Sequence, residues 1–234
     1  MNTLGLIGGM SWVSTRTYYE HLNHLVQAAR GAQASAPLLI ESLDYSGLAR
    51  LSTAADWDRA GAVLVASAKR LESAGAGALV IASNAMHKVY DTVAAAVTIP
   101  VIHIAETVGA RMAQDDVGRA ALIGSRNVMV DEFYRERLVA HEIELLPPAL
   151  ETVDTLDRII YDELVQGKAT RQAERALKTI IVDLERQGAE AIVLGCTELE
   201  MVVDVDANVL PIYDCTRIHC EAAAAWILGN AQAA

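Results

Sequence analysis

The sequence repeats itself across its two halves, and this repeat constrains the fold more than any other feature does. Residues 70–84 (RLESAGAGALVIASN) align with residues 183–197 (DLERQGAEAIVLGCT) at a constant offset of 113 positions, since 196 − 83 = 113. A shorter match joins residues 6–8 to residues 122–124. A repeat with so long a period indicates two duplicated domains rather than a solenoid of small units.

Within each half, short apolar runs alternate with amphipathic stretches. Apolar runs of this kind are typical of strands buried on both faces of a parallel sheet. The pattern predicts an α/β fold with two pseudo-symmetric domains, each a parallel sheet flanked by helices. We expect residues 1–104 with 213–234 to form the N-terminal domain and residues 105–212 the C-terminal domain, with one helix over residues 128–141. The expected strands cover residues 3–8, 37–44, 78–82, 99–103, 119–124, 142–146, 191–194 and 209–213.

One of these runs ends in a cysteine that is a candidate for chemistry. Residues 191–199 read AIVLGCTEL, an apolar run followed by Gly195 and then Cys196. Because glycine permits a tight turn, Cys196 is expected at the carboxyl end of the strand, the edge where open α/β sheets bind ligands. Packing is the alternative explanation, since free cysteine is among the most buried residue types.

The repeat gives Cys196 a counterpart, because Ser83 occupies the matching position in the first half. If the halves face each other about a pseudo-twofold axis, Ser83 and Cys196 lie on opposite walls of one cleft. Inversion of a carbon centre removes a proton from one face and returns a proton to the other. A thiol suits this task because its free pKa of about 8.5 allows it to act as base or acid. Such a reaction requires no cofactor.

Composition narrows the classes of partner and compartment. The formal net charge of −11 and the pI near 4.9 argue against nucleic acid or an anionic membrane surface as a partner. No apolar run is long enough to span a bilayer, and the glycine-broken N-terminus has no basic residue before Arg16, so no secretory signal is expected. Three irregularly spaced cysteines favour a reducing cytoplasm over a disulfide framework.

The sequence indicates neither a metal site nor a pyridoxal-phosphate site. The motif Cys215-x-x-x-His219-Cys220 lacks a second pair of ligands with zinc-like spacing. The chain has only four lysines, and none of them ends a predicted strand as a Schiff-base lysine would be expected to do. We therefore expect neither a metal nor any other cofactor.

Four motifs follow one another along nearly the whole chain: GLIGGMSW at residues 5–12, SNAMHK at 83–88, GSRNVMVDEFY at 124–134 and GCTE at 195–198. In this order they resemble the aspartate/glutamate racemase family, most clearly its small bacterial amino-acid racemases. The resemblance implies an isomerase that racemises a small amino-acid substrate without pyridoxal phosphate or another cofactor. It also implies an active-site cleft between the two domains and a homodimer.

The resemblance assigns roles to individual residues. Cys196 falls on the second catalytic cysteine of the family, and Ser83 falls on the position of the first. The other positions carried over are the expected substrate-binding residues, which are Met10, Ser52, Asn84, Ala85, Ser125, Thr197 and Glu198.

Several positions depart from the family pattern. Ser83 replaces a cysteine, Ala85 stands where a threonine usually helps to hold the substrate carboxylate, and Thr155 stands where many relatives carry a lysine. Each change removes a thiol, a hydroxyl or a charge. Because a missing charge-assisted hydrogen bond forgoes ~1.5–3 kcal/mol, this chain should hold a doubly charged amino acid less well.

Two other functions stay open. Arylmalonate decarboxylases of the same superfamily work with a single cysteine at the position of Cys196, and the loss of the first cysteine is compatible with that class. An inactive relative that binds an amino acid without turnover is the second alternative. Glu198 also has two interpretations: it raises the basicity of Cys196 or binds a substrate ammonium, or it is a carboxylate favoured by the start of a helix.

Overall fold

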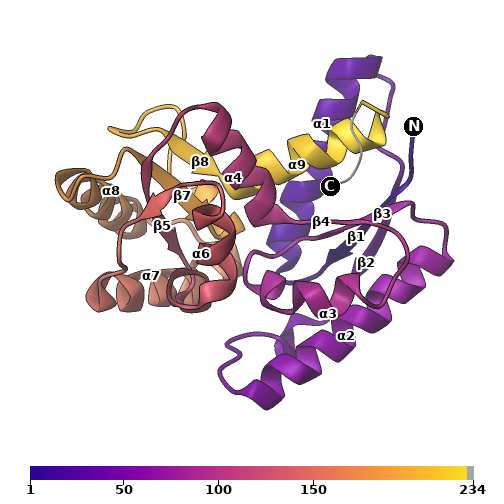
Figure 1. The fold of residues 1–234 in the computed structure, drawn as a ribbon, viewed down its shortest axis with the longest axis horizontal. Helices are drawn as coiled ribbons and strands as arrows, with labels where there is room; N and C mark the ends of the chain where they lie inside the picture. Colours follow the sequence, from indigo (N-terminus) through magenta and orange to yellow (C-terminus); the bar gives the residue numbers. More distant parts are fainter. Residues whose placement is uncertain (231–234) are drawn as a thin grey trace. The chain divides into compact units, whose positions relative to one another are not determined.

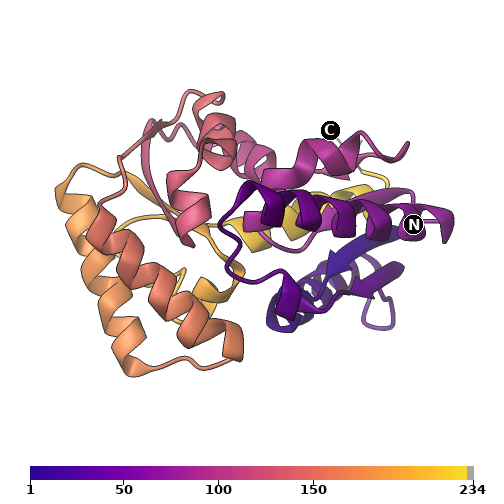
Figure 2. The ribbon, with the colours of Figure 1, turned by 90° about the horizontal axis from the view of Figure 1, so that it is seen from below.

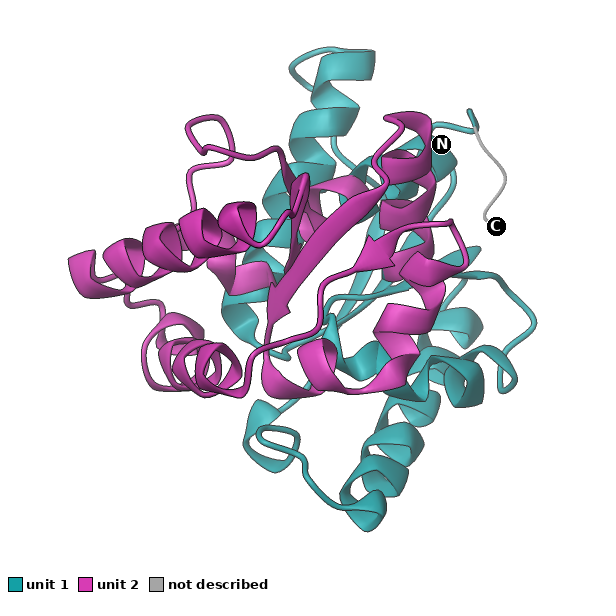
Figure 3. Ribbon diagram, turned by 60° about the vertical axis from the view of Figure 1, so that its left-hand side comes forward, with its two compact units in different colours: residues 1–104, 219–234 teal, residues 105–218 magenta. Residues whose placement is uncertain are grey.

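The chain splits into two compact units, which Figure 3 shows in different colours. A computed structural model describes residues 1–230. Unit 1 contains Met1–Ile104 together with the chain from His219 onward, and unit 2 contains Ala105–Ile218. Each unit has its own four-stranded sheet, and every strand pair in both sheets is parallel. The predicted α/β fold with two domains is therefore confirmed.

The chain returns to unit 1 within helix α9 (Cys215–Ile227). The boundary expected from the sequence lies earlier, at residue 213. In the structure Tyr213 belongs to strand β8 (Ile212–Asp214), which pairs with β7 (Ala191–Gly195) in unit 2. Backbone hydrogen bonds to the neighbouring strand thus keep this segment in unit 2.

The sheet of unit 1 has the strand order β2-β1-β3-β4. Its central strands, β1 and β3, are buried along their whole length, as expected for a parallel sheet covered on both faces. Leu4 of β1 pairs with Leu38 on one side and Ala78 on the other, which fixes the register. The strands are Leu4–Gly8 (β1), Leu38–Ser42 (β2), Ala78–Ile81 (β3) and Val101–Ile102 (β4).

Helices cover both faces of the unit 1 sheet (Figure 1). Because side chains alternate along a strand, Leu79 of β3 packs with α2 and α3, whereas Val80 packs with α1 and α9. The terminal helix α9 therefore completes a core that begins at the other end of the chain. The further helices of unit 1 are α1 (Trp12–Arg30), α2 (Ala54–Ser73) and α3 (Tyr90–Ala94), with the short 3₁₀ helices η1 (Tyr45–Gly47) and η2 (Ala85–Val89).

The sheet of unit 2 repeats this arrangement, with the order β6-β5-β7-β8. Helices α7 and α8 lie side by side (Figure 2), and Leu156 and Ile181 from them pack in one core with Ile192 of β7. The strands are β5 (Arg119–Gly124), β6 (Glu144–Leu145), β7 and β8. The helices are α4 (Ile104–Gln114), α5 (Arg126–Val130), α6 (Glu132–Val139), α7 (Leu150–Asp162), η3 (Leu164–Gln166), α8 (Arg171–Arg186) and η4 (Thr197–Met201).

The single helix expected over residues 128–141 is wrong. The structure has two helices there, α5 and α6, separated by Asp131. The backbone of Asp131 is extended, with φ −76° and ψ 153°, so the helical hydrogen-bond ladder stops at this residue. Among residues 1–230, none of the helices is both long and apolar enough to cross a membrane.

A fully buried histidine, His219, ties α9 into unit 1. Its Nδ1 lies 2.7 Å from the hydroxyl of Tyr18, and its Nε2 lies 3.0 Å from the carbonyl oxygen of Ile102. Since a carbonyl can only accept, Nε2 carries the proton and Nδ1 accepts from Tyr18. Burial lowers the pKa of His219 to about 3, and the neighbouring His87 acts in the same direction. The ring is therefore neutral in the folded protein at neutral pH.

His219 should make the protein sensitive to acid. Between pH 6.5 and about 3, the unfolded chain binds a proton at this ring that the folded chain does not bind, so stability falls as the pH falls. This one group should lower the free energy of unfolding by up to ~1.4 kcal/mol per pH unit. Substitution His219→Gln removes the titration and keeps a donor for Ile102, so urea unfolding should show a shallower loss of stability between pH 6.5 and about 5, a window above the ordinary pKa of carboxylates. Equal pH slopes for the two proteins would contradict this assignment.

Candidate active site

Two paired glycines end the central strands of unit 2. Gly124 of β5 and Gly195 of β7 are direct partners in the sheet. A Cβ on Gly124 would lie 2.7 Å from the carbonyl oxygen of Gly195, and a Cβ on Gly195 would lie 2.7 Å from Cγ1 of Val128. Neither position has room for a side chain. The next residues, Ser125 and Cys196, therefore leave two adjacent strands at the same edge of the sheet.

Cys196 is half-buried, and its thiol contacts a carboxylate. The Sγ atom donates to Oε2 of Glu198 at 3.1 Å, and the Glu198 side chain is itself buried. Burial raises the pKa of the Cys196 thiol well above its usual value, and the charge and hydrogen bond of Glu198 raise it further. In the resting protein Cys196 is thus a thiol whose proton is hydrogen-bonded to a carboxylate.

Four of the residues predicted for the site come together in unit 2. Ser125 follows β5, whereas Cys196, Thr197 and Glu198 follow β7, the neighbouring strand. Ser125, Thr197 and Glu198 are all buried. Hydroxyl, thiol and carboxylate groups thus gather at one sheet edge, a set that can hold and deprotonate a small polar ligand.

Unit 1 places its predicted residues at the equivalent edge. Ser83 and Asn84 follow β3, Met10 follows the neighbouring strand β1, and these three residues are buried. Ala85 begins η2 and is half-buried. Ser52 lies in the segment that joins β2 to α2. It is exposed, and its amide donates to the Asp56 carboxylate, which helps to cap α2.

The turn that carries Met10 depends on a residue that the sequence analysis did not assign to the site. The Thr15 hydroxyl accepts the amide proton of Gly9 at 2.7 Å and donates to the carbonyl oxygen of Ser11 at 3.0 Å. Gly9 has a φ of 85°, a value that favours glycine. A threonine one turn after the Ser11 N-cap of α1 is the signal that could have identified this contact.

A second such residue is His87, whose Nδ1 lies 2.8 Å from the carbonyl oxygen of Ser83. The spacing of four residues between Ser83 and His87 is visible in the sequence. A histidine at that spacing pairs with many kinds of group, so the contact needed the folded structure to be identified.

The candidate ligands for a metal have other partners. Cys215 accepts a hydrogen bond from the Tyr134 hydroxyl at 2.9 Å, and His219 is bonded to Tyr18 and Ile102. In the part of the chain from residue 1 to 230, no group of three or more His, Cys, Asp or Glu side chains is arranged to hold a metal ion. The three cysteines are all free thiols.

Comparisons with known proteins agree with this architecture. The sequence profile described as Asp/Glu/hydantoin racemase matches residues 7–223. A Yersinia pestis protein assigned provisionally as an Asp/Glu racemase is 38% identical, with a TM-score of 0.88 over 97% of this chain and 100% of that chain. An aspartate racemase homologue from Pyrococcus horikoshii OT3 is 27% identical, with a TM-score of 0.80 over 98% of both chains. An allantoin racemase from Klebsiella pneumoniae is 16% identical and shares the fold, with a TM-score of 0.61 over 100% of this chain and 91% of that chain.

The glycine pair gives a prediction about stability. Gly124→Ala should lower the free energy of unfolding by ~1–3 kcal/mol, because the new methyl group meets the backbone of Gly195. Gly195→Ala should cost less, since its nearest contact is a side-chain methyl of Val128, which can shift. Urea unfolding of the two variants compares these costs directly. A larger loss for Gly195→Ala would show that the close approach of the two backbones is not the constraint.

The carboxylate beside Cys196 gives a prediction about reactivity. Glu198→Gln removes the negative charge, so the pKa of the Cys196 thiol should fall and more thiolate should form near pH 8. Alkylation of Cys196 by iodoacetamide, read by peptide mass spectrometry, should then be about tenfold faster. Glu200→Gln, the same change two residues further along η4, is the matched control. Equal rates for all three proteins would mean that Glu198 does not hold the thiol proton.

Proposed function

The chain belongs to the Asp/Glu/hydantoin racemase family, and on that basis we propose that it is an amino-acid racemase that needs no pyridoxal phosphate or other cofactor. Its reaction removes the α-proton of the substrate on one face and returns a proton on the other. Cys196 serves one face, and Ser83, or a water molecule that it holds, serves the other. The observation that carries the proposal is the duplication, because Ser83 and Cys196 follow equivalent central strands of equivalent sheets.

The contact between Cys196 and Glu198 supports an order of events on the cysteine side. A thiol must lose its proton before it can act as a base. Glu198 accepts that proton from Sγ, and the thiolate then takes the α-proton of the substrate. The resulting planar carbanion is protonated from the Ser83 side in the racemising direction. At this point Glu198 carries the proton released by Sγ, and the Ser83 side lacks the proton that it gave to the carbanion. Proton exchange with solvent removes the first and replaces the second, which returns the protein to its starting state.

The serine makes the two faces unequal. A serine hydroxyl is a far weaker acid than a thiol and gives a far poorer base at neutral pH. We therefore expect the enantiomer whose α-proton faces Cys196 to exchange that proton with solvent much faster than it racemises. The other enantiomer should exchange slowly.

The substrate class follows from the polar groups that the chain lacks. Ala85 and Thr155 replace a hydroxyl and a cation that would anchor carboxylates in the family pattern. The carboxyl edge of unit 2 carries the carboxylate of Glu198 and thus favours the ammonium group of an amino acid. We propose an amino-acid substrate, aspartate, glutamate or a related amino acid, with weak binding of the doubly charged ones. We also propose a cytoplasmic homodimer, which the family resemblance and the free cysteines favour.

The alternative supported by a specific observation is decarboxylation. Arylmalonate decarboxylases of the same superfamily work with a single cysteine at the position of Cys196, and a serine in place of the first cysteine, at Ser83, is compatible with that class. Release of carbon dioxide from a malonate, without α-exchange of amino acids, would favour this alternative. Tight binding of an amino acid without exchange would favour an inactive relative.

One panel tests the proposed function. Single L- and D-amino acids are incubated with the protein in heavy water, and α-deuteration is read by mass spectrometry. We expect one enantiomer of the preferred amino acid to exchange faster than the other, and Cys196→Ala to abolish exchange from both. Ser83→Cys should raise exchange from the slower enantiomer by about 10²-fold, because it restores a thiol base.

Cys220→Ala provides the matched control, since Cys220 is buried in the α1–α9 core of unit 1 and follows neither β3 nor β7. Its exchange rates should equal those of the unaltered protein. Activity that survives Cys196→Ala, or equal and fast exchange from both enantiomers of the unaltered protein, would reject the assignment of the two faces.

A further inference from the structure

A buried histidine holds the backbone of Ser83 in unit 1. His87 is 2% exposed, its Nδ1 lies 2.8 Å from the Ser83 carbonyl oxygen, and its Nε2 lies 3.2 Å from the amide nitrogen of Ile104. The carbonyl can only accept and the amide can only donate. These two partners require a neutral ring with its proton on Nδ1.

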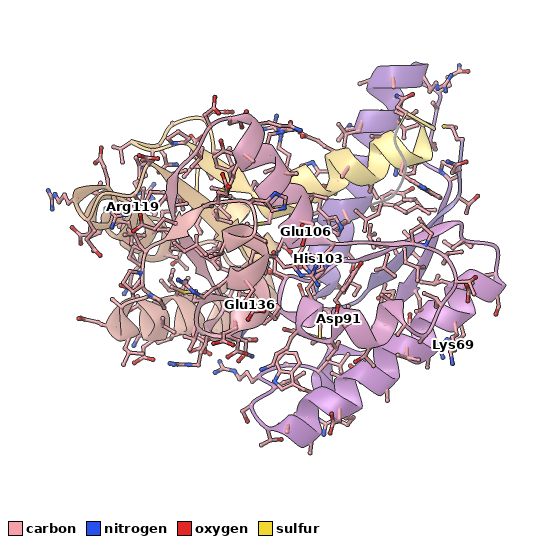
Figure 4. All side chains as sticks on the ribbon, viewed as in Figure 1. Lys69, Asp91, His103, Glu106, Arg119 and Glu136 are labelled. Atoms are coloured by element: carbon pink, nitrogen blue, oxygen red, sulfur yellow. The ribbon has the colours of Figure 1, made fainter. Side chains whose placement is uncertain are left out.

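Aromatic neighbours fix the orientation of this ring. Tyr90 stacks on it with an interplanar angle of 9° and a centroid separation of 6.1 Å. His103, labelled in Figure 4, meets it edge-on at 4.8 Å, and His219 does so at 5.8 Å. The Tyr90 hydroxyl is in turn anchored to the carbonyl oxygen of Val101 at 2.8 Å. A ring packed in this way has little freedom to flip or to move away from Ser83.

The bond to His87 completes the anchoring of the Ser83 peptide. The amide of Ser83 donates to the carbonyl oxygen of Ile81 at 2.8 Å, and the carbonyl of Ser83 accepts from His87. Both polar backbone groups of Ser83 are therefore bonded. With the backbone held at both ends, the direction of the Cα–Cβ bond is set, and with it the region that the Ser83 hydroxyl can reach.

We propose that His87 is a positioning residue for the Ser83 side of the reaction. It holds the Ser83 carbonyl through Nδ1–H and links it to the start of α4 through Ile104, so that the hydroxyl, or a water bound to it, stays aligned for proton transfer. His87 is not the proton donor itself, because both ring nitrogens are bonded to the backbone. The inference rests on the proposed function, since it assigns Ser83 to one face of the substrate.

Two substitutions separate the two hydrogen bonds of the ring. In His87→Asn the side-chain amide can place an NH₂ group where Nδ1–H was, which keeps the bond to Ser83 and loses the bond from Ile104. In His87→Gln the amide oxygen can take the place of Nε2, which keeps the bond from Ile104 and loses the bond to Ser83. Hydrogen exchange of the Ile104 amide reports, independently of activity, whether each variant retains the bond from Ile104: this amide should be protected in His87→Gln and exposed to exchange in His87→Asn.

The role of His87 predicts a one-sided effect on the reaction. His87→Gln should slow α-exchange from the enantiomer that faces Ser83 by about 10- to 10²-fold, through kcat rather than KM, because the group is misplaced and not removed. His87→Asn should stay within about threefold of the unaltered protein, as the bond that aligns Ser83 is kept. Exchange from the enantiomer that faces Cys196 should not change in either variant.

His141→Asn is the matched control, because this histidine lies in unit 2, bonds the carboxylate of Glu106 at 2.9 Å and follows neither β3 nor β7 (Glu106 is labelled in Figure 4). It should leave both exchange rates unaltered. Equal losses in His87→Asn and His87→Gln, or equal losses on both faces, would overturn the positioning role. Absence of exchange in the unaltered protein would overturn the proposed function and this role with it, whereas exchange that both His87 variants leave intact would overturn only the role of His87.

Discussion

The pairing of β7 with β5 is the interaction on which the candidate site in unit 2 depends. Five consecutive residue pairs join these strands, and the last of them is Gly124 with Gly195. A side chain at either glycine would collide with the backbone or with Val128, so the two strands stay close up to their ends. Parallel strands end at the same edge of a sheet, and this brings Ser125 beside Cys196.

A second constraint is electrostatic. The chain carries a net charge of −11, and one of its carboxylates, Glu198, is buried against the Cys196 thiol. A buried carboxylate is costly unless it is hydrogen-bonded, and here the thiol contributes one such bond. The same contact keeps the thiol protonated at rest. In unit 1, by contrast, the buried ionisable side chains His87 and His219 are uncharged. Each of these rings donates a hydrogen bond to a backbone carbonyl.

Much of the fold could be predicted from local patterns. Apolar runs identified the strands. The constant offset between residues 70–84 and residues 183–197 identified the duplication. The helix break at Asp131 was not predicted because aspartate is tolerated inside many helices. Only the extended backbone of Asp131 in the structure shows that the helix ends there. The sequence analysis did not assign Thr15 and His87 to the site, because their partners are backbone atoms of Gly9 and Ser83. Every residue has these backbone atoms, so the sequence does not show which side chain contacts them.

The sequence by itself determined the α/β class, the two-domain duplication and the position of Cys196 after a buried strand. It could do so because each follows from periodicity or from a repeated string of side chains. Only the tertiary structure decided that the Ser52 amide donates to the Asp56 carboxylate, that Glu198 accepts the hydrogen bond of the Cys196 thiol, and that His87 is bonded to the Ser83 carbonyl. Each of these depends on the distance and direction between particular atoms, which the order of residues does not specify but the packing of strands and helices does.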